Sequence, residues 1–349
     1  MNRATAVAPA NIAFTKFWGW RNEALTLPFH DTISMTLSAC GSRTTVLEID
    51  AARHASGTGD EIVLLDEAGN EIAPGGAFLA RVGAHLDLLR DVAAGPGGPR
   101  RGSGGPPLRV VTTNTMPMAT GIASSASGFA ALTVSAAAVL GIACDEAASS
   151  VLARRSGSGS AARSIPGGYV RWRAGTRDDG RDSFAESVHA PDYWALADTI
   201  AIVDTAPKVV SSRDGHRAAM TSPHFAARLR DMPERNARVL AALRARDLAA
   251  LGPVLEMEAL DLHRIAETSS AAVRYGSAAT DDVLRRVKAL RDEGIGAWFT
   301  LDAGPSVHVV SRSEEAARVE AALAAVAAVR ATRVNLPAPG AHLVTEHLA

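Results

Sequence analysis

The chain has 349 residues, 47% hydrophobic and 21% charged, and its formal net charge is −1. This length favours two domains, and the near-zero charge argues against a surface built to bind nucleic acid or an anionic membrane. The two cysteines, Cys40 and Cys144, allow at most one disulfide and no cysteine-based metal motif, so a cytoplasmic location is expected. Asn11 and Lys16 occur too early for a secretory signal peptide.

The first half of the chain alternates between strand and helix patterns. The Gly/Pro-rich segment 93–107 is expected to be a surface loop or linker, although its two arginines could touch a nucleotide. The Ala-rich run 129–144 is shorter than the ~20 residues of a membrane span, and we interpret it as an interior helix. Hydrophobic periodicity predicts strands over 3–8, 43–49, 61–65, 108–113 and 167–173, a helix over 75–93, and a second one that Asp145 caps and that runs to Arg155.

The pattern changes near residue 190, where a strand is followed by long helical segments. We therefore expect an α+β protein of two domains, 1–190 and 191–349, with a return of the last ~15 residues to the first domain as an alternative. The elements predicted in the second half are a strand at 198–205, helices between 222 and 268, a helix over 281–292, strands over 296–302 and 306–311, a helix over 313–329 and a short strand over 340–345.

Lysine is rare in this chain, since only Lys16, Lys208 and Lys288 occur among 36 basic residues. A lysine kept against such a bias can be one that arginine cannot replace, because a compact ammonium fits where a planar guanidinium does not. Chance is the alternative explanation for any one of the three.

Three stretches carry residues suited to chemistry. The first, "PMATGIASSASGFAAL" at 117–132, places small residues and hydroxyls between a strand and a helix, where N–H groups can bind phosphate. It lacks the Gly-Lys-Ser/Thr of the Walker loop. Ordinary helix capping is the alternative.

The second stretch, "RRSGSGSAARSIPGGYVRW" at 154–172, contains Ser158, Ser160 and Arg163. If it turns helical after Gly159, Ser160 and Arg163 share a face, and the guanidinium can clamp a carboxylate. The alternative is a surface turn with a solvated arginine.

The third stretch, "AWFTLDAGPSVHVV" at 297–310, reads as two strands around a Gly-Pro turn, with Asp302 where the first strand ends. An aspartate before Gly-Pro can simply form a turn. It can also project a carboxylate into a cleft, where it takes or orients a hydroxyl proton.

These stretches occur in order behind "ANIAFTKFWGWRNEALTLPFHDTISMTL", and the combination resembles the mevalonate diphosphate decarboxylase family of the galacto-, homoserine, mevalonate and phosphomevalonate (GHMP) kinase superfamily. The segments "RSGSGSAARSIPGGYVRW" and "TLDAGPSVHV" are similar to motifs specific to the decarboxylases, whereas "GIASSASGFAAL" is similar to a phosphate loop shared across the superfamily. The segment "APKVVSSRDGHRAAMTSP" also looks like a substrate segment of the family.

The resemblance implies an architecture and partners. The fold would be GHMP-kinase-like, with an N-terminal domain like domain 2 of ribosomal protein S5, a C-terminal ferredoxin-like α/β sandwich, and the active site in the cleft between them. The substrates would be ATP with Mg²⁺ and a phosphorylated mevalonate, and the enzyme would be a homodimer of the mevalonate pathway of isoprenoid biosynthesis.

The resemblance also implies roles for individual residues. Asp302 would lie beside the 3-hydroxyl of the substrate, Lys16 near the transferring phosphate, and Arg163 on the C1 carboxylate. The residues implied at the phosphorylated end of the substrate are Phe17, Trp20, Ser158, Ser160, Lys208, Ser212 and Arg213. Those implied at the ATP phosphates are Pro117, Thr120, Gly121, Ala123, Ser124, Ser125 and Ser127, with Ser124 and Ser125 also near Mg²⁺.

The chain departs from the family pattern at several of these positions. Phe17 replaces the usual tyrosine, Trp20 replaces a second lysine, and His30-Asp31-Thr32 replaces Asn-Ser-Ser. In the family, that tyrosine and lysine contact the diphosphate, so their loss leads to the hypothesis that mevalonate 5-phosphate replaces the 5-diphosphate.

Other functions stay open on sequence alone. A kinase that phosphorylates the 3-hydroxyl and stops, a kinase of another small alcohol, and a non-catalytic nucleotide-binding protein are the alternatives. Four of the ten histidines, His30, His216, His263 and His308, are scattered, and we interpret them as structural or surface residues.

Overall fold

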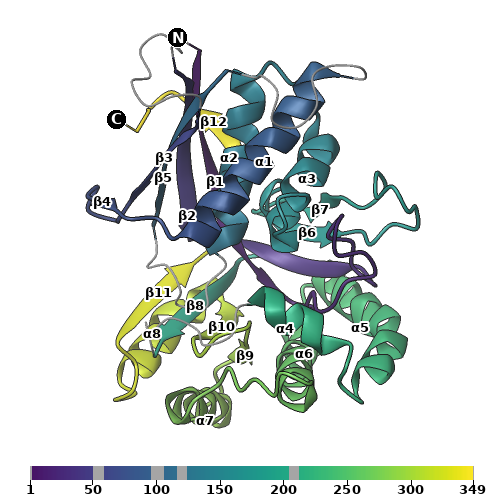
Figure 1. Cartoon of the computed structure of the whole chain (residues 1–349). Helices are drawn as coiled ribbons and strands as arrows, with labels where there is room; N and C mark the ends of the chain where they lie inside the picture. The colour runs from purple at the N-terminus through teal and green to yellow at the C-terminus, as the bar shows by residue number, and fades with distance from the viewer. Residues whose placement is uncertain (1, 50–58, 96–105, 116–123, 204–211, 349) are drawn as a thin grey trace.

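The computed structural model describes residues 2–49, 59–95, 106–115, 124–203 and 212–348. Within them lie two sheets, one in each domain, and Figure 1 shows the larger sheet above the smaller one. The larger sheet has eight strands in the order β12-β1-β2-β5-β3-β4, with β6 and β7 attached to β2. Its strands are β1 (Arg3–Ala13), β2 (Thr32–Glu48), β3 (Glu61–Leu65), β4 (Glu71–Ile72), β5 (Leu108–Asn114), β6 (Tyr169–Trp172), β7 (Ala185–His189) and β12 (His342–Val344).

Helices cover one face of the larger sheet (Figure 1). They are α1 (Gly76–Ala94), α2 (Ser124–Val139) and α3 (Glu146–Arg154), followed by the 3₁₀ turn η1 (Gly159–Ser164). The Ala-rich helix α2 packs closely on β1 and β2 because its small side chains, such as the fully buried Ala126 and Ala130, let the backbones approach.

The second domain is a four-stranded sheet in the order β11-β8-β10-β9, with helices packed against it. The long helices α5 and α6 pack against each other, and α6 also packs on β9. The elements of this domain are α4 (Ser212–Ala219), α5 (Phe225–Ala245), α6 (Leu248–Thr268), α7 (Ala278–Asp292), α8 (Ala316–Ala324), the 3₁₀ turn η2 (Ser313–Glu315), β8 (Leu196–Ile202), β9 (Trp298–Thr300), β10 (Val307–Arg312) and β11 (Ala331–Asn335).

A shared hydrophobic core joins the domains. One cluster of buried side chains includes Phe14 and Met35 from the β1–β2 side together with Val239 and Leu255 from α5 and α6. The chain also crosses back, since β12 pairs antiparallel with β1.

Most predicted elements are confirmed, with differences in their ends. The strand predicted from residue 43 begins at Thr32, since residues 32–37 pair with β1 and β6 before an irregularity in the register. The interior helix predicted over 129–144 spans Ser124–Val139 and is followed by Gly141, whose φ of 68° a helix does not adopt. The helix predicted to reach 329 ends at Ala324, and the short elements β4, β7, β11 and α4 were not predicted.

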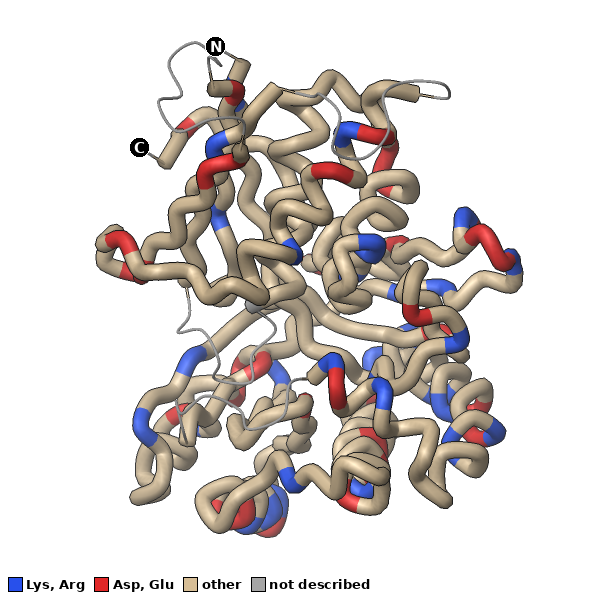
Figure 2. The backbone as a smooth tube through the Cα atoms, in the orientation of Figure 1, with Lys and Arg blue, Asp and Glu red and all other residues tan. Residues whose placement is uncertain are grey.

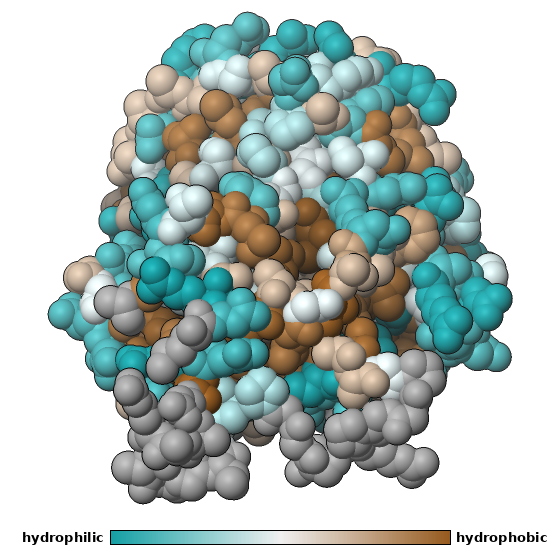
Figure 3. All heavy atoms as spheres, turned by 90° about the horizontal axis from the view of Figure 1, so that it is seen from above, coloured by the Kyte–Doolittle hydropathy of each residue, from teal (hydrophilic) through white to brown (hydrophobic). Residues whose placement is uncertain are grey.

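The described surface carries both charge signs. Basic and acidic residues are interspersed along the backbone in Figure 2, and hydrophobic residues gather near the middle of the face in Figure 3, with hydrophilic ones around them. Among the described residues, none of the helices has both the length and the apolar character needed to cross a membrane.

Candidate active site

Asp302 lies in the turn between β9 and β10, and its neighbours explain why a carboxylate occurs in an apolar segment. Leu301 is buried in the core of the second domain, and Ala303 is buried against a different cluster that contains Trp18. The Asp302 side chain keeps 27% of its surface exposed and faces the cleft. The turn is fixed by the Gly304 N–H, which donates to the Asp302 carbonyl at 2.8 Å.

Lys16 meets Asp302 across the domain boundary. Lys16 Nζ lies 2.7 Å from Asp302 Oδ1, and the lysine side chain is only 1% exposed. Burial lowers the pKa of Lys16, and the attraction of Asp302 opposes that shift without cancelling it. Burial alone would raise the pKa of Asp302, but the positive charges around it, that of Lys16 first, outweigh burial and lower it. Asp302 is therefore a carboxylate at neutral pH.

Arg163 lies in η1 and is buried, with 4% exposure. Its Nε donates to Asn11 Oδ1 at 3.1 Å and its Nη1 to Thr32 Oγ1 at 2.8 Å, and neither bond uses Nη2. Burial lowers the pKa of the guanidinium to about 10, so it stays charged at neutral pH. Its charge lowers the pKa of both Lys16 and Asp302.

Two residues that the sequence analysis did not assign orient Arg163. Asn11 Nδ2 donates to the Ser160 carbonyl and to Ser164 Oγ, which turns the Asn11 oxygen toward the guanidinium. Thr32 is the last residue of the His30-Asp31-Thr32 segment, which differs from the family pattern. Its neighbour Asp31 binds Arg171 and not Arg163. Asn11 stands within the motif that carries the resemblance, which is the signal that could have identified it.

The predicted phosphate loop and substrate turn meet at the start of α2. Ser125 Oγ lies 3.3 Å from Ser158 Oγ, which lies 3.4 Å from Ser160 Oγ. Ser127 is buried, and its hydroxyl lies 2.7 Å from that of Ser42 in β2. Ser124 is the first residue of α2. The predicted residues Pro117, Thr120, Gly121, Ala123 and Lys208 lie outside the described residues.

Ser212 and Arg213 begin α4. The exposed Arg213 side chain reaches the turn before η1, since a Cβ on Gly157 would lie 3.2 Å from Arg213 Nη1. It also donates to Glu23 Oε1 at 3.2 Å. Arg213 therefore lies beside the serine turn that was predicted to bind the phosphorylated end of the substrate.

An aromatic group lies next to this turn. His216 packs against the rings of Phe17, Trp18 and Trp20 at centroid distances of 4.4, 4.5 and 4.8 Å. The Gly19 N–H donates to His216 Nδ1, so the ring hydrogen sits on Nε2. Burial, with a contribution from Arg163, lowers the pKa of His216 to about 3, and the ring is neutral. This packing fits the interpretation of His216 as a structural residue.

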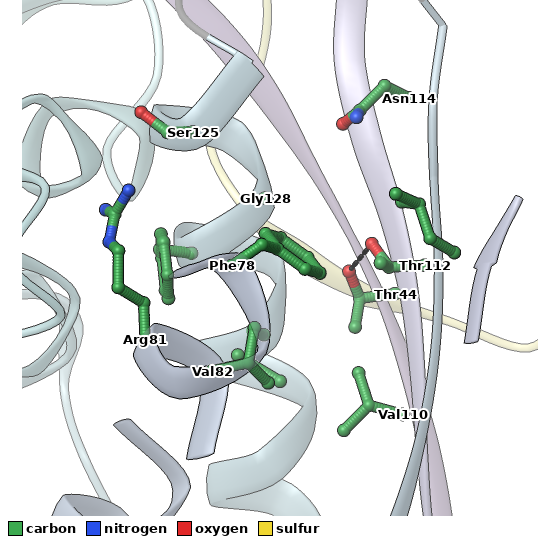
Figure 4. A pocket seen from close by; sticks show the side chains of 12 residues that line it. Thr44, Phe78, Arg81, Val82, Val110, Thr112, Asn114, Ser125 and Gly128 are labelled. Atoms are coloured by element: carbon green, nitrogen blue, oxygen red, sulfur yellow. Dashed lines mark hydrogen bonds between the residues drawn. The ribbon is translucent and has the colours of Figure 1, made fainter. Parts of the chain in front are cut away.

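A cavity open to solvent, about 560 Å³ with the space at its mouth included, lies between α1, α2 and the strands β2 and β5 (Figure 4). Its walls are mainly apolar and include Phe78, Val82 and Phe129. The guanidinium of Arg81 lies 4.6 Å from the ring centre of Phe129 and points toward Ser125. Sequence analysis missed Arg81, a basic residue one position before the core-facing Val82 of α1.

The described residues do not include a cluster of three or more His, Cys, Asp or Glu side chains able to hold a metal ion. A magnesium ion brought by nucleotide phosphates needs no such cage, because Mg²⁺ keeps waters and binds phosphate oxygens with few protein ligands. The exposed Ser125 at the start of α2 fits that arrangement.

The two-domain fold, with an acid–lysine pair that joins the domains, is that of a GHMP-type enzyme. Residues 8–185 match the diphosphomevalonate decarboxylase-like N-terminal domain, and residues 199–337 match the mevalonate 5-diphosphate decarboxylase C-terminal domain. The chain therefore belongs to the mevalonate diphosphate decarboxylase family.

Individual relatives and solved structures point to the same family. The chain is 35% identical to diphosphomevalonate decarboxylase mvd1 of Aspergillus fumigatus, over 87% of this chain and 75% of that one. It is 31% identical to the diphosphomevalonate decarboxylase of Homo sapiens, over 91% and 79% of the two chains. A solved structure of the Enterococcus faecalis mevalonate diphosphate decarboxylase superposes with a TM-score of 0.84 at 31% identity, over 98% of each chain. These similarities confirm the predicted fold and the decarboxylase function over that of a kinase.

Proposed function

We propose that this chain catalyses the ATP-dependent decarboxylation of a phosphorylated mevalonate in isoprenoid biosynthesis, releasing ADP, phosphate and CO₂. The observation that carries the proposal is the Lys16–Asp302 ion pair, both of whose pKa values the charge of Arg163 lowers. A similar solved structure, with a TM-score of 0.85 at 31% identity over 98% of each chain, is described as "MDDEF in complex with MVAPP, AMPPCP and Magnesium". That description supports ATP, magnesium and a mevalonate phosphate as the ligands of the cleft.

The nucleotide would enter beneath α1. The apolar cavity suits a purine, and its mouth opens near Ser125 at the start of α2, whose N–H groups face phosphate oxygens. Arg81 would bind the nucleotide from α1, because it has no acidic partner among the described residues and its guanidinium points toward Ser125. Bound Mg²⁺ would neutralise phosphate charge during transfer.

The first step would move the γ-phosphoryl group of ATP onto the tertiary C3 hydroxyl. The O–H bond breaks, a new P–O bond forms, and ADP leaves. Asp302 would orient the hydroxyl and receive its proton, while Lys16 stabilises charge on the transferring group. Since the pKa of Asp302 is lowered, it is a weak base, and its main contribution would be orientation and electrostatic support.

The second step would expel the new phosphate. The C3–O bond breaks with its electron pair on phosphate, C3 becomes electron-poor, and the C1–C2 bond electrons form the C2=C3 double bond as CO₂ leaves. Arg163 Nη2 would hold the C1 carboxylate without protonating it, because Asn11 and Thr32 occupy the other two nitrogens. Asp302 would return its proton to the departing phosphate, and the carboxylate that results would stabilise positive charge at C3.

The substrate is proposed to be mevalonate 5-phosphate rather than the 5-diphosphate. Where the family pattern has a tyrosine and a lysine, this chain has Phe17 and Trp20 packed around the neutral His216. Such a wall offers no cation to a second phosphate, whereas Arg213 beside the serine turn suffices for one.

Steady-state kinetics with both substrates test this proposal. ADP and CO₂ are measured together, and equal amounts are expected. ADP without CO₂ would identify a kinase that stops at phosphorylation, and a kcat/KM at least about tenfold higher for the diphosphate would remove the 5-phosphate assignment. The cytoplasmic location and the homodimer are further proposals that rest on the family resemblance, and light scattering tests the latter.

A further inference from the structure

The backbone of Lys16 is held by the second domain. Strand β1 ends at Ala13, and the next two N–H groups, of Phe14 and Thr15, both donate to the Ile33 carbonyl. Lys16 has left the sheet, so its backbone needs other partners. Its N–H donates to Glu258 Oε2 at 2.9 Å, and its carbonyl accepts from Arg228 Nη2 at 2.8 Å.

These two partners belong to a buried ionic network between α5 and α6. Arg228 and Glu258 have fully buried side chains and bind each other at 2.8 Å. Arg228 also binds Asp261 at 2.9 Å, and Arg235 binds Glu258 and Asp261, each at 2.7 Å. The spacing suits helices, because Arg228 and Arg235 lie two turns apart on α5 while Glu258 and Asp261 are three apart on α6.

Helix α6 also touches the other member of the ion pair. His263 Nε2 lies 3.1 Å from the Asp302 carbonyl oxygen. Glu258 and His263 belong to the same helix, so α6 contacts the backbones of both Lys16 and Asp302. Helix α6 therefore holds the backbones of both residues of the 2.7 Å Lys16–Asp302 ion pair, although the two residues lie in different domains.

Stability alone does not explain this network. Burying four charges is expensive, and well-packed apolar residues of similar volume are often as stable or more so. The distinguishing feature is that two members reach out of the network to the N–H and the carbonyl of one residue, Lys16. We propose that Arg228 and Glu258 are positioning residues that hold Lys16 against Asp302 for phosphoryl transfer, an inference that rests on the function proposed above.

The charge of Glu258 adds a second effect. The charges that raise the pKa of Lys16 are those of Asp302 and Glu258, and the charge of Arg163 lowers it. His263 of α6 also interacts with Lys16, and Arg228 of α5 contacts its carbonyl. Glu258 itself faces Arg228 and Arg235 of α5 and Asp261 of its own helix, and its charge also acts on His30. Removing the Glu258 charge therefore deprotonates Lys16 at lower pH.

The main test compares two matched substitutions, Arg228→Met and Arg235→Met. Both remove a largely buried arginine of α5 that binds Glu258 and Asp261, but only Arg228 contacts the Lys16 backbone. Arg228→Met is expected to lower kcat by about 10² with the KM values of both substrates within about threefold, since a misplaced group acts on the chemical step. Arg235→Met is expected to lower the melting temperature and to leave kcat within about threefold.

Glu258→Gln gives an independent readout, because it keeps an oxygen acceptor for the Lys16 N–H and removes the charge. The basic limb of the kcat–pH profile is expected to move to lower pH, which a purely structural role would not produce. Equal kcat losses in Arg228→Met and Arg235→Met, or an unmoved basic limb in Glu258→Gln, would overturn the inference. Wild-type turnover is measured first, and its absence with either mevalonate phosphate would refute the proposed function instead.

Discussion

Asp302→Asn is the most direct test of the proposed chemistry. The substitution keeps the shape of the side chain and removes the charge that Lys16 Nζ meets at 2.7 Å. Two losses are expected together. The amide cannot take the hydroxyl proton, and the pKa of Lys16 falls further, because burial remains while its main opposing attraction is gone.

The expected decrease in kcat follows from these two losses. A positioned acid or base contributes about 10²–10⁴ in rate, so kcat should fall by about 10² or more, or about 2.7 kcal/mol of activation free energy. Because the pKa of Lys16 falls when the charge of Asp302 is removed, Lys16 can lose its proton and need not stay charged in its buried position. The cost in unfolding free energy should therefore stay near 1–3 kcal/mol.

The assay measures ADP and CO₂ release at saturating substrates, alongside thermal unfolding. Asp282→Asn, an exposed aspartate of α7 paired with Arg285, is the matched control and should change neither quantity. A kcat for Asp302→Asn within threefold of the wild type, with the fold intact, would show that the ion pair does not take part in the reaction.

Three further predictions concern nucleotide binding, substrate choice and acid stability. Arg81→Met should raise the KM for ATP about fivefold or more and leave the KM for the mevalonate phosphate unchanged. Arg109→Met, on the exposed side of β5, is the control. Equal effects of Arg81→Met on both KM values would contradict the assignment of Arg81 to the nucleotide. Phe17→Tyr restores the hydroxyl of the family pattern and should raise kcat/KM for the 5-diphosphate relative to the 5-phosphate by about tenfold; an unchanged ratio would show that this position does not select the substrate. Burial holds the pKa of His85 and His216 at about 3 and that of His30 at about 4, so the unfolded chain binds protons first as pH falls. The unfolding free energy should be highest above pH ~6.5 and fall toward pH 4 by up to about 1.4 kcal/mol per pH unit for each histidine; urea titrations should show this slope, and His85→Gln should reduce it.

The sequence predicted those parts of the site that one local stretch specifies. Asp302 and Arg163 could be predicted as site residues because each lies next to a recognisable turn. Asp302 precedes Gly-Pro at the end of a strand, and Arg163 follows a Gly-Ser turn. Lys16 stood out through the scarcity of lysine. Their meeting across two domains came from the family resemblance, since no local pattern encodes a contact between residues 16 and 302.

The parts that were missed depend on tertiary packing. Arg228 and Glu258 look like ordinary charged residues of amphipathic helices, and only the folded structure shows that they are fully buried against the Lys16 backbone. His216 was interpreted as a structural or surface residue, but the sequence did not show that it packs against Trp20 from a distant segment or that burial keeps its ring neutral. Strand β2 was predicted to begin at residue 43, whereas it begins at Thr32.

The pairing of Thr5 with Val344 affects how the protein is made on the ribosome. Strand β12 is synthesised after the whole second domain, yet it completes the edge of the sheet that begins with β1. Until it emerges, that edge of β1 carries unpaired backbone groups that another chain could bind. Non-local pairing of this kind slows folding, so chaperones that shield exposed strands during translation should increase the yield of active enzyme more than those that act after release.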